Sequence, residues 1–162
     1  MDKSLSRVIK ILKELEIKPI IYGSFGVSAY LGNFKTLEDI DILIKNEFMN
    51  DRWEEFKRFL ALAGFNLIDE KEHEFKFEGN KIGFASEQIL IRDKIIDDYS
   101  ELVQYKDADA FTLTPEDFLK AYRFSEKDGY RINSRGKKDK DIIEKLGIYV
   151  QNKKSFNLTN GS

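Results

Sequence analysis

The sequence predicts a single domain of the α/β or α+β class. A chain of 162 residues is the usual size of one domain, and it contains no linker long enough to separate two. Apolar residues make up 41% and aromatic residues 13%, which is enough for one hydrophobic core and too much for a disordered chain. Segments with helical periodicity alternate with short strand-like runs, and this alternation is typical of a sheet packed against helices.

The first 44 residues predict two helices, each followed by a strand. Leu5, Val8 and Leu12 recur at helical spacing in the first helix, and Gly32 is suited to end the second. The second strand alternates acidic and aliphatic side chains, as a half-buried strand does. In chain order these elements occupy residues 4–15, 18–22, 25–31 and 39–44.

The middle of the chain predicts one helix and three strands. Trp53, Phe56 and Leu60 lie on one face of the helix, and Gly64 is suited to cap its end. Two of the strands flank a glycine–asparagine pair, which favours a hairpin. In chain order these elements occupy residues 49–63, 65–68, 74–77 and 81–84.

The last third predicts a strand at 109–113 and two helices. Thr114 and Pro115 form a strong helix start, because threonine caps the amides of the first turn and proline fits the first helical position. The final helix is expected at 137–146, with Gly147 closing it. Residues 89–103 show no single pattern. We expect the domain to span 1–150 and to be followed by a polar C-terminal tail, 151–162, that frays.

Composition excludes several kinds of function. The absence of cysteine rules out disulfide scaffolds, zinc–cysteine sites and thiol nucleophiles, and a single histidine rules out multi-histidine metal sites. The 27 basic and 29 acidic residues give a net charge of −2, which argues against general nucleic-acid binding. No apolar run approaches the roughly 20 residues that cross a bilayer, and the first residues lack a signal-peptide layout. We therefore expect a soluble, cytoplasmic protein without membrane contact.

A glycine–serine pair directly follows the first strand. Gly23 allows a sharp turn and the close approach of a ligand, because it has no Cβ. Ser24 and the first amides of the following helix form a corner suited to phosphate. An ordinary strand-to-helix turn explains these two residues equally well when they are considered alone.

Two carboxylates stand on the second strand. Residues two apart in a strand point to the same face, so Asp39 and Asp41 lie side by side, while Ile40 and Ile42 face the core. Because neighbouring carboxylates repel each other, a divalent ion with oxygen ligands would stabilise them. A phosphate corner beside a carboxylate pair suits metal-assisted phosphoryl or nucleotidyl transfer. Considered alone, the pair is also compatible with a solvated strand face.

The run from residue 20 to residue 44 resembles the signature of the nucleotidyltransferase superfamily, which includes polymerase-beta-like, aminoglycoside-type and minimal domains. Tyr22-Gly23-Ser24 and the Asp39-Ile40-Asp41-Ile42 segment match it, although the 14 residues between them are at or beyond the usual upper limit. The resemblance implies a small mixed, mostly antiparallel sheet flanked by helices. It also implies binding of ATP or another nucleoside triphosphate together with Mg²⁺ or Mn²⁺, with Asp39 and Asp41 as metal ligands.

One departure from the family pattern concerns a third carboxylate, which the family places on a later strand. Gly83 stands at the position expected to face the site. Glu74, Glu78 and Glu87 are possible substitutes, the first two because they share the site-facing parity of the neighbouring strand and the third because it follows the strand.

Basic residues concentrate near the C-terminus, with eight Lys or Arg and three Asp or Glu between Arg131 and Lys154. Lys137 and Lys138 are candidate phosphate-binding residues, with Arg131 and Arg135 as further candidates. The alternative is an exposed basic helix without a ligand. His73 is interpreted as a surface residue beside two glutamates rather than as a catalytic base.

The sequence thus predicts a magnesium-dependent nucleotidyltransferase that moves a nucleoside monophosphate from a nucleoside triphosphate to an acceptor hydroxyl. The acceptor is open: a small molecule such as an aminoglycoside-like antibiotic, a protein or an RNA end. The alternative function is a catalytically reduced nucleotide-binding or interaction module, as in a toxin–antitoxin-like pair, because the third carboxylate is not evident. A third interpretation is an unrelated α/β domain with a chance motif.

Overall fold

The computed structural model describes residues 2–32, 39–127 and 129–160, with the backbone alone for 129–138 and 158–160. In chain order the helices are α1 (Lys3–Lys13), α2 (Gly23–Leu31), α3 (Asn46–Met49), α4 (Trp53–Leu62), α5 (Gln88–Arg92), the 3₁₀ turn η1 (Tyr99–Glu101), α6 (Pro115–Glu126) and α7 (Gly129–Asn160). The strands are β1 (Ile20–Tyr22), β2 (Ile40–Ile44), β3 (Asn66–Asp69), β4 (Glu74–Phe77), β5 (Asn80–Ser86), β6 (Val103–Gln104) and β7 (Phe111–Thr112).

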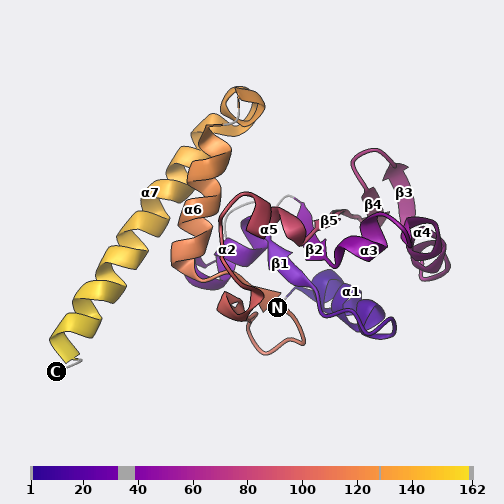
Figure 1. The fold of residues 1–162 in the computed structure, drawn as a ribbon, viewed down its shortest axis with the longest axis horizontal. Coiled ribbons are helices and arrows are strands. Elements are labelled where there is room, and N and C mark those ends of the chain that lie inside the picture. The colour runs from indigo at the N-terminus through magenta and orange to yellow at the C-terminus, as the bar shows by residue number, and fades with distance from the viewer. Residues whose placement is uncertain (1, 33–38, 128, 161–162) are drawn as a thin grey trace.

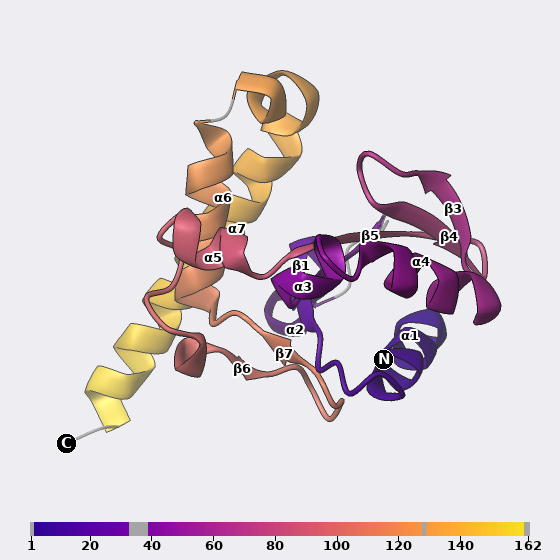
Figure 2. The same ribbon diagram turned by 45° about the vertical axis from the view of Figure 1, so that its right-hand side comes forward.

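The seven strands of the described residues form one mixed sheet in the order β3-β4-β5-β2-β1-β7-β6. Pairs β2–β5 and β1–β7 are parallel, and the other four are antiparallel. The prediction of a mixed, mostly antiparallel sheet with flanking helices is therefore confirmed. Figures 1 and 2 show α6 and α7 side by side at one end of the molecule, with α1 and α4 at the other.

Two apolar clusters pack on the two faces of the sheet. The first joins α1, α3 and α4 to Ile40, Ile42 and Ile44 of β2. The second joins α5, α6 and α7 to Leu43 of β2 and Ile20 of β1. Residues of opposite parity in one strand thus enter different clusters, as the pleat requires. The face under α6 and α7 is the one that carries the predicted site.

The hairpin and the Thr114 helix start are confirmed, although the turn lies one residue earlier than the predicted Gly79-Asn80 pair, since Asn80 begins β5. Glu78 and Gly79 connect β4 to β5 with φ angles of +50° and +82°, which is the left-handed pair that a two-residue hairpin turn of the I′ type uses. Thr114 Oγ1 accepts a 3.1 Å hydrogen bond from the Asp117 amide and caps α6.

The helix predicted at 49–63 is present as α4 but begins later, at Trp53, because the short helix α3 ends at Met49 and residues 50–52 separate the two. The Asn50 side chain donates to the Asn46 side chain at 2.7 Å and to its carbonyl oxygen at 3.2 Å. Asparagine side chains that bond to nearby backbone in this way compete with helix continuation.

The end predicted for the last helix is also wrong. Helix α7 begins at Gly129, continues through Gly147 and reaches Asn160, so it includes most of the predicted polar tail. Leu146 and Val150 are buried on either side of Gly147. Their burial outweighs the roughly 1 kcal/mol that glycine costs inside a helix. None of the helices in the described residues is both long enough and apolar enough to span a membrane.

Candidate functional site

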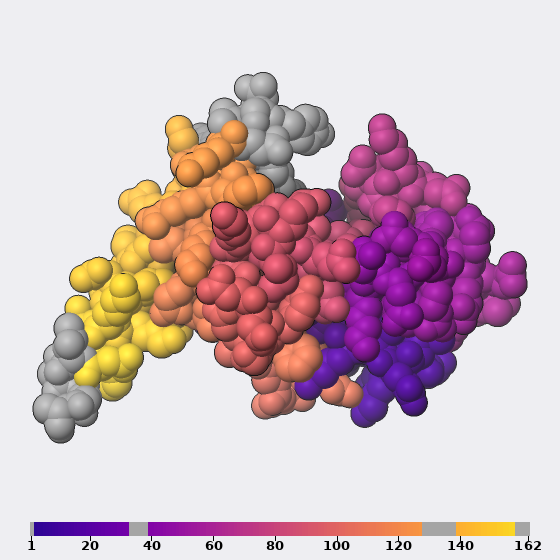
Figure 3. All heavy atoms as spheres, viewed as in Figure 1, coloured from indigo at the N-terminus to yellow at the C-terminus, as the bar shows by residue number. Residues whose placement is uncertain are grey.

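A pocket of about 280 Å³ opens on the α6 face of the sheet. Its lining includes Gly23 and Ser24 together with Asp39 and Asp41, so these four predicted site residues lie in one cavity. Residues of α6 and of the β3–β4 loop line opposite sides. In Figure 3 the surface is hollowed between these two parts of the molecule.

The floor of the pocket is a row of paired residues that crosses four strands. Tyr22 pairs with Asp41, Asp41 with Gly83, and Gly83 with Glu74. Paired residues on neighbouring strands share a face and stand close together. The register therefore places residue 83 beside Asp41, as the strand parity predicts, and it places Glu74 on the other side of Gly83.

The two aspartates lie at the start of β2, Asp41 within the strand and Asp39 directly before it, and both are partly exposed. Along this face of β2, Leu43 is 2% exposed in the second cluster, whereas Asp41 is only partly buried and the Asp39 side chain is 38% exposed. Burial of a carboxylate is unfavourable, and the partial exposure of these two side chains lowers that cost and leaves them accessible to a ligand.

Gly23 makes room for Asp41. Its φ angle of +59° is in the left-handed region, and a Cβ at this position would collide with Asp41 Oδ2. On the other side of Asp41, a Cβ on Gly83 would lie 3.5 Å from Oδ1, at ordinary van der Waals distance. The Asp41 carboxylate therefore lies close to the Gly23 backbone, where helix α2 begins.

Helix α2 begins earlier than predicted. Gly23 and Ser24 form its first turn instead of a loop before it. The amides at the start of a helix have no intrahelical acceptors, and they make this end electropositive. The corner expected to suit phosphate is thus the first turn of a nine-residue helix, which begins beside Asp41 and lines the same pocket as both aspartates.

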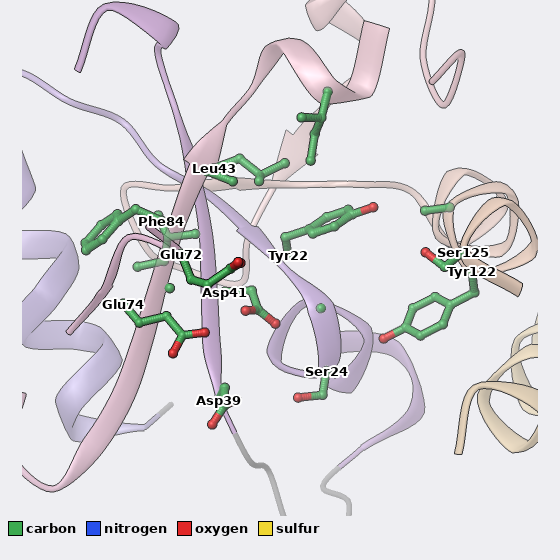
Figure 4. A pocket seen from close by; sticks show the side chains of 16 residues that line it. Tyr22, Ser24, Asp39, Asp41, Leu43, Glu72, Glu74, Phe84, Tyr122 and Ser125 are labelled. Atoms are coloured by element: carbon green, nitrogen blue, oxygen red, sulfur yellow. The ribbon is translucent and has the colours of Figure 1, made fainter. Parts of the chain in front are cut away.

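Two glutamates lie with the two aspartates on one side of the pocket, and we call these four residues the acidic wall. Glu72 and Glu74 both line the pocket, and Figure 4 shows them on the same side as Asp41. His73 between them has a left-handed φ of +55°, and its ring packs edge-on against Trp53 with a centroid distance of 4.6 Å. Glu72 was not among the sequence candidates. In the sequence, the only indication that Glu72 belongs to the site is its spacing of two from Glu74. The left-handed backbone at His73, which lies between them, cannot be predicted from the sequence.

The other two candidates for a third acid lie elsewhere. Glu78 forms a 2.8 Å ion pair with Arg7 of α1 and is not among the described residues that line the pocket. Glu87 is half-buried before α5 and is likewise not one of them, and burial raises the pKa of its carboxyl. Of the three candidates, Glu74 is the one that shares the pocket with the aspartates.

The wall opposite the acids comes from α6 and was not predicted as part of the site. Tyr122 and Ser125 line it, and Figure 4 shows both facing the side of the pocket where Ser24 lies. The sequence places Tyr122 on the inner face of a helix, which indicates core packing and gives no sign of a cavity. The side chains of Lys137 and Lys138 lie outside the described residues, so their predicted contact with phosphate stays a prediction.

The donors present are suited to a hard divalent cation. All four acidic residues of the pocket offer oxygen, and Mg²⁺ typically takes one or two carboxylates together with waters and substrate phosphates. Among the described residues, no group of three or more acidic or histidine side chains is arranged to hold a metal ion by itself. Asp39 and Asp41 therefore fit a metal whose remaining ligands come from substrate and water.

Lys81 provides a positive charge at the rim of the pocket. Its Nζ lies 3.0 Å from Glu74 Oε2 and 3.7 Å from Asp39 Oδ2. The lysine ammonium thus occupies a position between these two carboxylates. The hydrogen bond with Glu74 and the charge of Asp39 raise the pKa of the lysine.

Comparison with known proteins finds a relative by sequence and solved structures with a similar fold. No family model matches the chain. The uncharacterized protein YnaI of Bacillus subtilis is 37% identical over 142 residues, which cover 86% of this chain and 90% of YnaI. The crystal structure of ANT(2″)-Ia in complex with adenylyl-2″-tobramycin superposes with a TM-score of 0.59 and 11% identity, over 93% of this chain and 89% of that one.

A solution structure of the antibiotic-resistance factor ANT(2″)-Ia agrees, with a TM-score of 0.55 and 13% identity over 98% of this chain and 96% of that one. At these identities the two comparisons establish the fold. The fold class expected from the sequence resemblance, that of a nucleotidyltransferase domain, is therefore confirmed.

Proposed function

Since this chain belongs to the same protein family as YnaI of Bacillus subtilis and has a nucleotidyltransferase-like fold, we propose that it is a nucleotidyltransferase. In the proposed reaction a nucleoside monophosphate passes from a nucleoside triphosphate to an acceptor hydroxyl. The supporting observation is the position of Asp41, which stands beside Asp39 and directly against the first turn of α2.

The proposed reaction is an in-line displacement at the α-phosphorus. The acceptor oxygen forms a bond to this phosphorus, the bond to the β-phosphate oxygen breaks, and pyrophosphate leaves. The proton of the acceptor hydroxyl passes to a carboxylate of the acidic wall or to water. A bound Mg²⁺ or Mn²⁺ would contribute charge stabilisation at the phosphates, and Asp39 and Asp41 would hold it.

The residues of the chain contribute positioning and electrostatics. Ser24 and the first amides of α2 bind phosphate oxygens, since they are donors at the positive end of a helix. Glu74 serves as the third carboxylate, because Gly83 leaves the space between Glu74 and Asp41 open. Groups held in place before the reaction lower the barrier without reorganisation in the transition state.

The test is release of pyrophosphate from labelled ATP, GTP, CTP and UTP with Mg²⁺, in the presence and absence of acceptor panels. We expect turnover that Asp41→Asn lowers about 100-fold or more, as loss of a transition-state contact does. Asp51→Asn is the matched control, since Asp51 is an exposed aspartate between α3 and α4 and should leave turnover unchanged. Turnover that persists in the Asp41 variant would contradict the proposal.

Gly83 favours a second candidate, a module that binds nucleotide without transferring it. Under this alternative the protein binds a nucleoside triphosphate and Mg²⁺ but releases no pyrophosphate with any acceptor. Gly83→Asp tests whether the missing carboxylate is the reason for the lack of transfer. The substitution would place a carboxylate beside Asp41, where there is room for a Cβ. Turnover that appears only in this variant would favour the module.

A further inference from the structure

Lys81 forms ion pairs with two carboxylates, one on strand β4 and one directly before strand β2. It lies near the start of β5, with Glu74 of β4 on one side and Asp39, next to β2, on the other. The three side chains are 42%, 25% and 38% exposed in the order Lys81, Glu74 and Asp39. The pairing is therefore at the rim of the site, where solvent and ions have access.

The charges of the pocket explain why a cation is stabilised there. Four carboxylates line the pocket, and among its described lining residues none is lysine or arginine. Neighbouring carboxylates repel each other, so a cation between them lowers the energy of the free protein. Lys81 is placed for this role by its strand parity, since Lys81, Gly83 and Glu74 face the same side of the sheet.

We propose that Lys81 is a resident counter-cation of the site, which occupies Asp39 and Glu74 in the free protein and competes there with the divalent cation. When the divalent cation binds, the ammonium leaves these carboxylates and turns toward the substrate phosphates. The inference rests on the proposed function, because it assigns Lys81 a positioning role in the loading of metal and nucleotide.

The chemistry of lysine suits such an exchange. Its ammonium is a single charge on a flexible four-carbon stem, so it can release one anion and reach another without backbone movement. A divalent cation carries twice the charge and binds carboxylate oxygens directly, so it displaces the lysine ammonium from the carboxylates when it is present. A lysine ammonium is charged at neutral pH, so the competition operates under ordinary conditions.

The test measures binding of Mn²⁺ without nucleotide, by the decrease of the free-ion electron paramagnetic resonance signal. Lys81→Met removes the charge and keeps an unbranched apolar stem. We expect its Mn²⁺ dissociation constant to fall roughly two- to fivefold, the range that loss of a competing exposed ion pair allows. The same variant should raise KM for the nucleoside triphosphate, because the released ammonium no longer meets the phosphates.

Lys76→Met is the matched control. Lys76 pairs with Lys81 in the register and shares its face of the sheet, and none of the described acidic side chains forms an ion pair with it. It reports the effect of removing one positive charge from this face. Equal gains in Mn²⁺ affinity in both variants would overturn the proposal, as would unchanged or weaker binding in Lys81→Met.

The two proposals fail in different ways. Tighter Mn²⁺ binding in Lys81→Met, without pyrophosphate release by any variant, supports the counter-cation and contradicts the transferase. Pyrophosphate release that needs Asp41, with Mn²⁺ affinity independent of Lys81, supports the transferase and overturns the counter-cation. If neither the unaltered protein nor Lys81→Met binds Mn²⁺ at millimolar Mn²⁺ concentration, the counter-cation proposal is overturned.

Discussion

Strand β2 presents opposite chemistry on its two faces. Ile40, Ile42 and Ile44 are at most 1% exposed, under α1, α3 and α4, whereas the other face passes from buried Leu43 to partly buried Asp41 and then to Asp39. The first face is covered along the whole strand. On the second face Leu43 packs in the cluster with α5, α6 and α7, whereas Asp41 and Asp39 line the pocket.

Alternate residues of this one strand therefore have different roles. Those on one face stabilise the core, and those on the other face form the site. A substitution on the isoleucine face should change the free energy of unfolding and leave the site intact. A substitution on the aspartate face should change the site and leave the core intact. Each of the following experiments tests whether the separation holds.

The largest effect on stability is expected from Ile42→Ala. Ile42 is 0% exposed in the first cluster, and truncation of such a side chain costs about 3 kcal/mol of unfolding free energy. Denaturant unfolding measures this loss, and the turnover per folded molecule should stay within a factor of about three. If turnover instead falls together with stability, as it would if the site depended on core packing, the two faces are not separable.

Gly23→Ala should act on the other face. The added Cβ collides with Asp41 Oδ2, and displacement of a site carboxylate by about 1 Å can cost roughly 100-fold in turnover. Gly79→Ala is the control, since Gly79 also has a positive φ but a Cβ there meets nothing within 4 Å. It should lose about 1 kcal/mol of stability and keep its turnover. Equal loss of turnover in both variants would mean that backbone strain, and not Asp41, is responsible.

Glu74→Gln compared with Glu78→Gln tests which acid completes the site. We expect about a tenfold loss of turnover for Glu74→Gln, the size of one charge-assisted contact. Glu78→Gln removes the charge that pairs with Arg7 and should lower stability slightly without changing turnover. Steady-state kinetics and thermal melting separate the two results, and loss of turnover in Glu78→Gln would contradict the assignment.

The smallest effect is expected from Glu87→Gln. Burial raises the pKa of this carboxyl, so the folded protein binds the proton more tightly than the unfolded chain does. Its contribution to stability therefore increases as pH falls through the folded pKa toward the unfolded value of about 4.3. At pH 7.5 the glutamine should raise the melting temperature by about 2 °C, with the exposed Glu14→Gln as control. An equal rise at pH 4 would show that ionisation is not the cause.

The sequence was sufficient for those parts of the site that depend on local geometry. The two-residue spacing places Asp39 and Asp41 on one face, and the same parity places residue 83 toward the site. The turn signal places Gly23 directly after a strand, where helix α2 begins. Each of these results follows from the two-residue repeat of a strand or from a turn signal, neither of which depends on distant residues.

Other parts could not be predicted, because they depend on which strands become neighbours. The pairing of Gly83 with both Asp41 and Glu74 requires β5 to lie between β2 and β4. The ion pairs of Lys81 depend on this strand order as well. The position of Tyr122 in the pocket depends on the packing of helix α6 against the sheet. The sequence alone therefore gave three candidates for the third acid, while the register selects Glu74 by proximity.

By itself, the order of residues determined most of the elements, the inward and outward faces of the strands and the presence of a glycine corner and two aspartates, because these properties arise within a few consecutive residues. Only the tertiary structure decided which carboxylates meet, where the pocket opens and which cation lies among the acids. The physical reason is that contacts between distant segments are set by packing of the whole core, and the energies of many side chains decide that packing together.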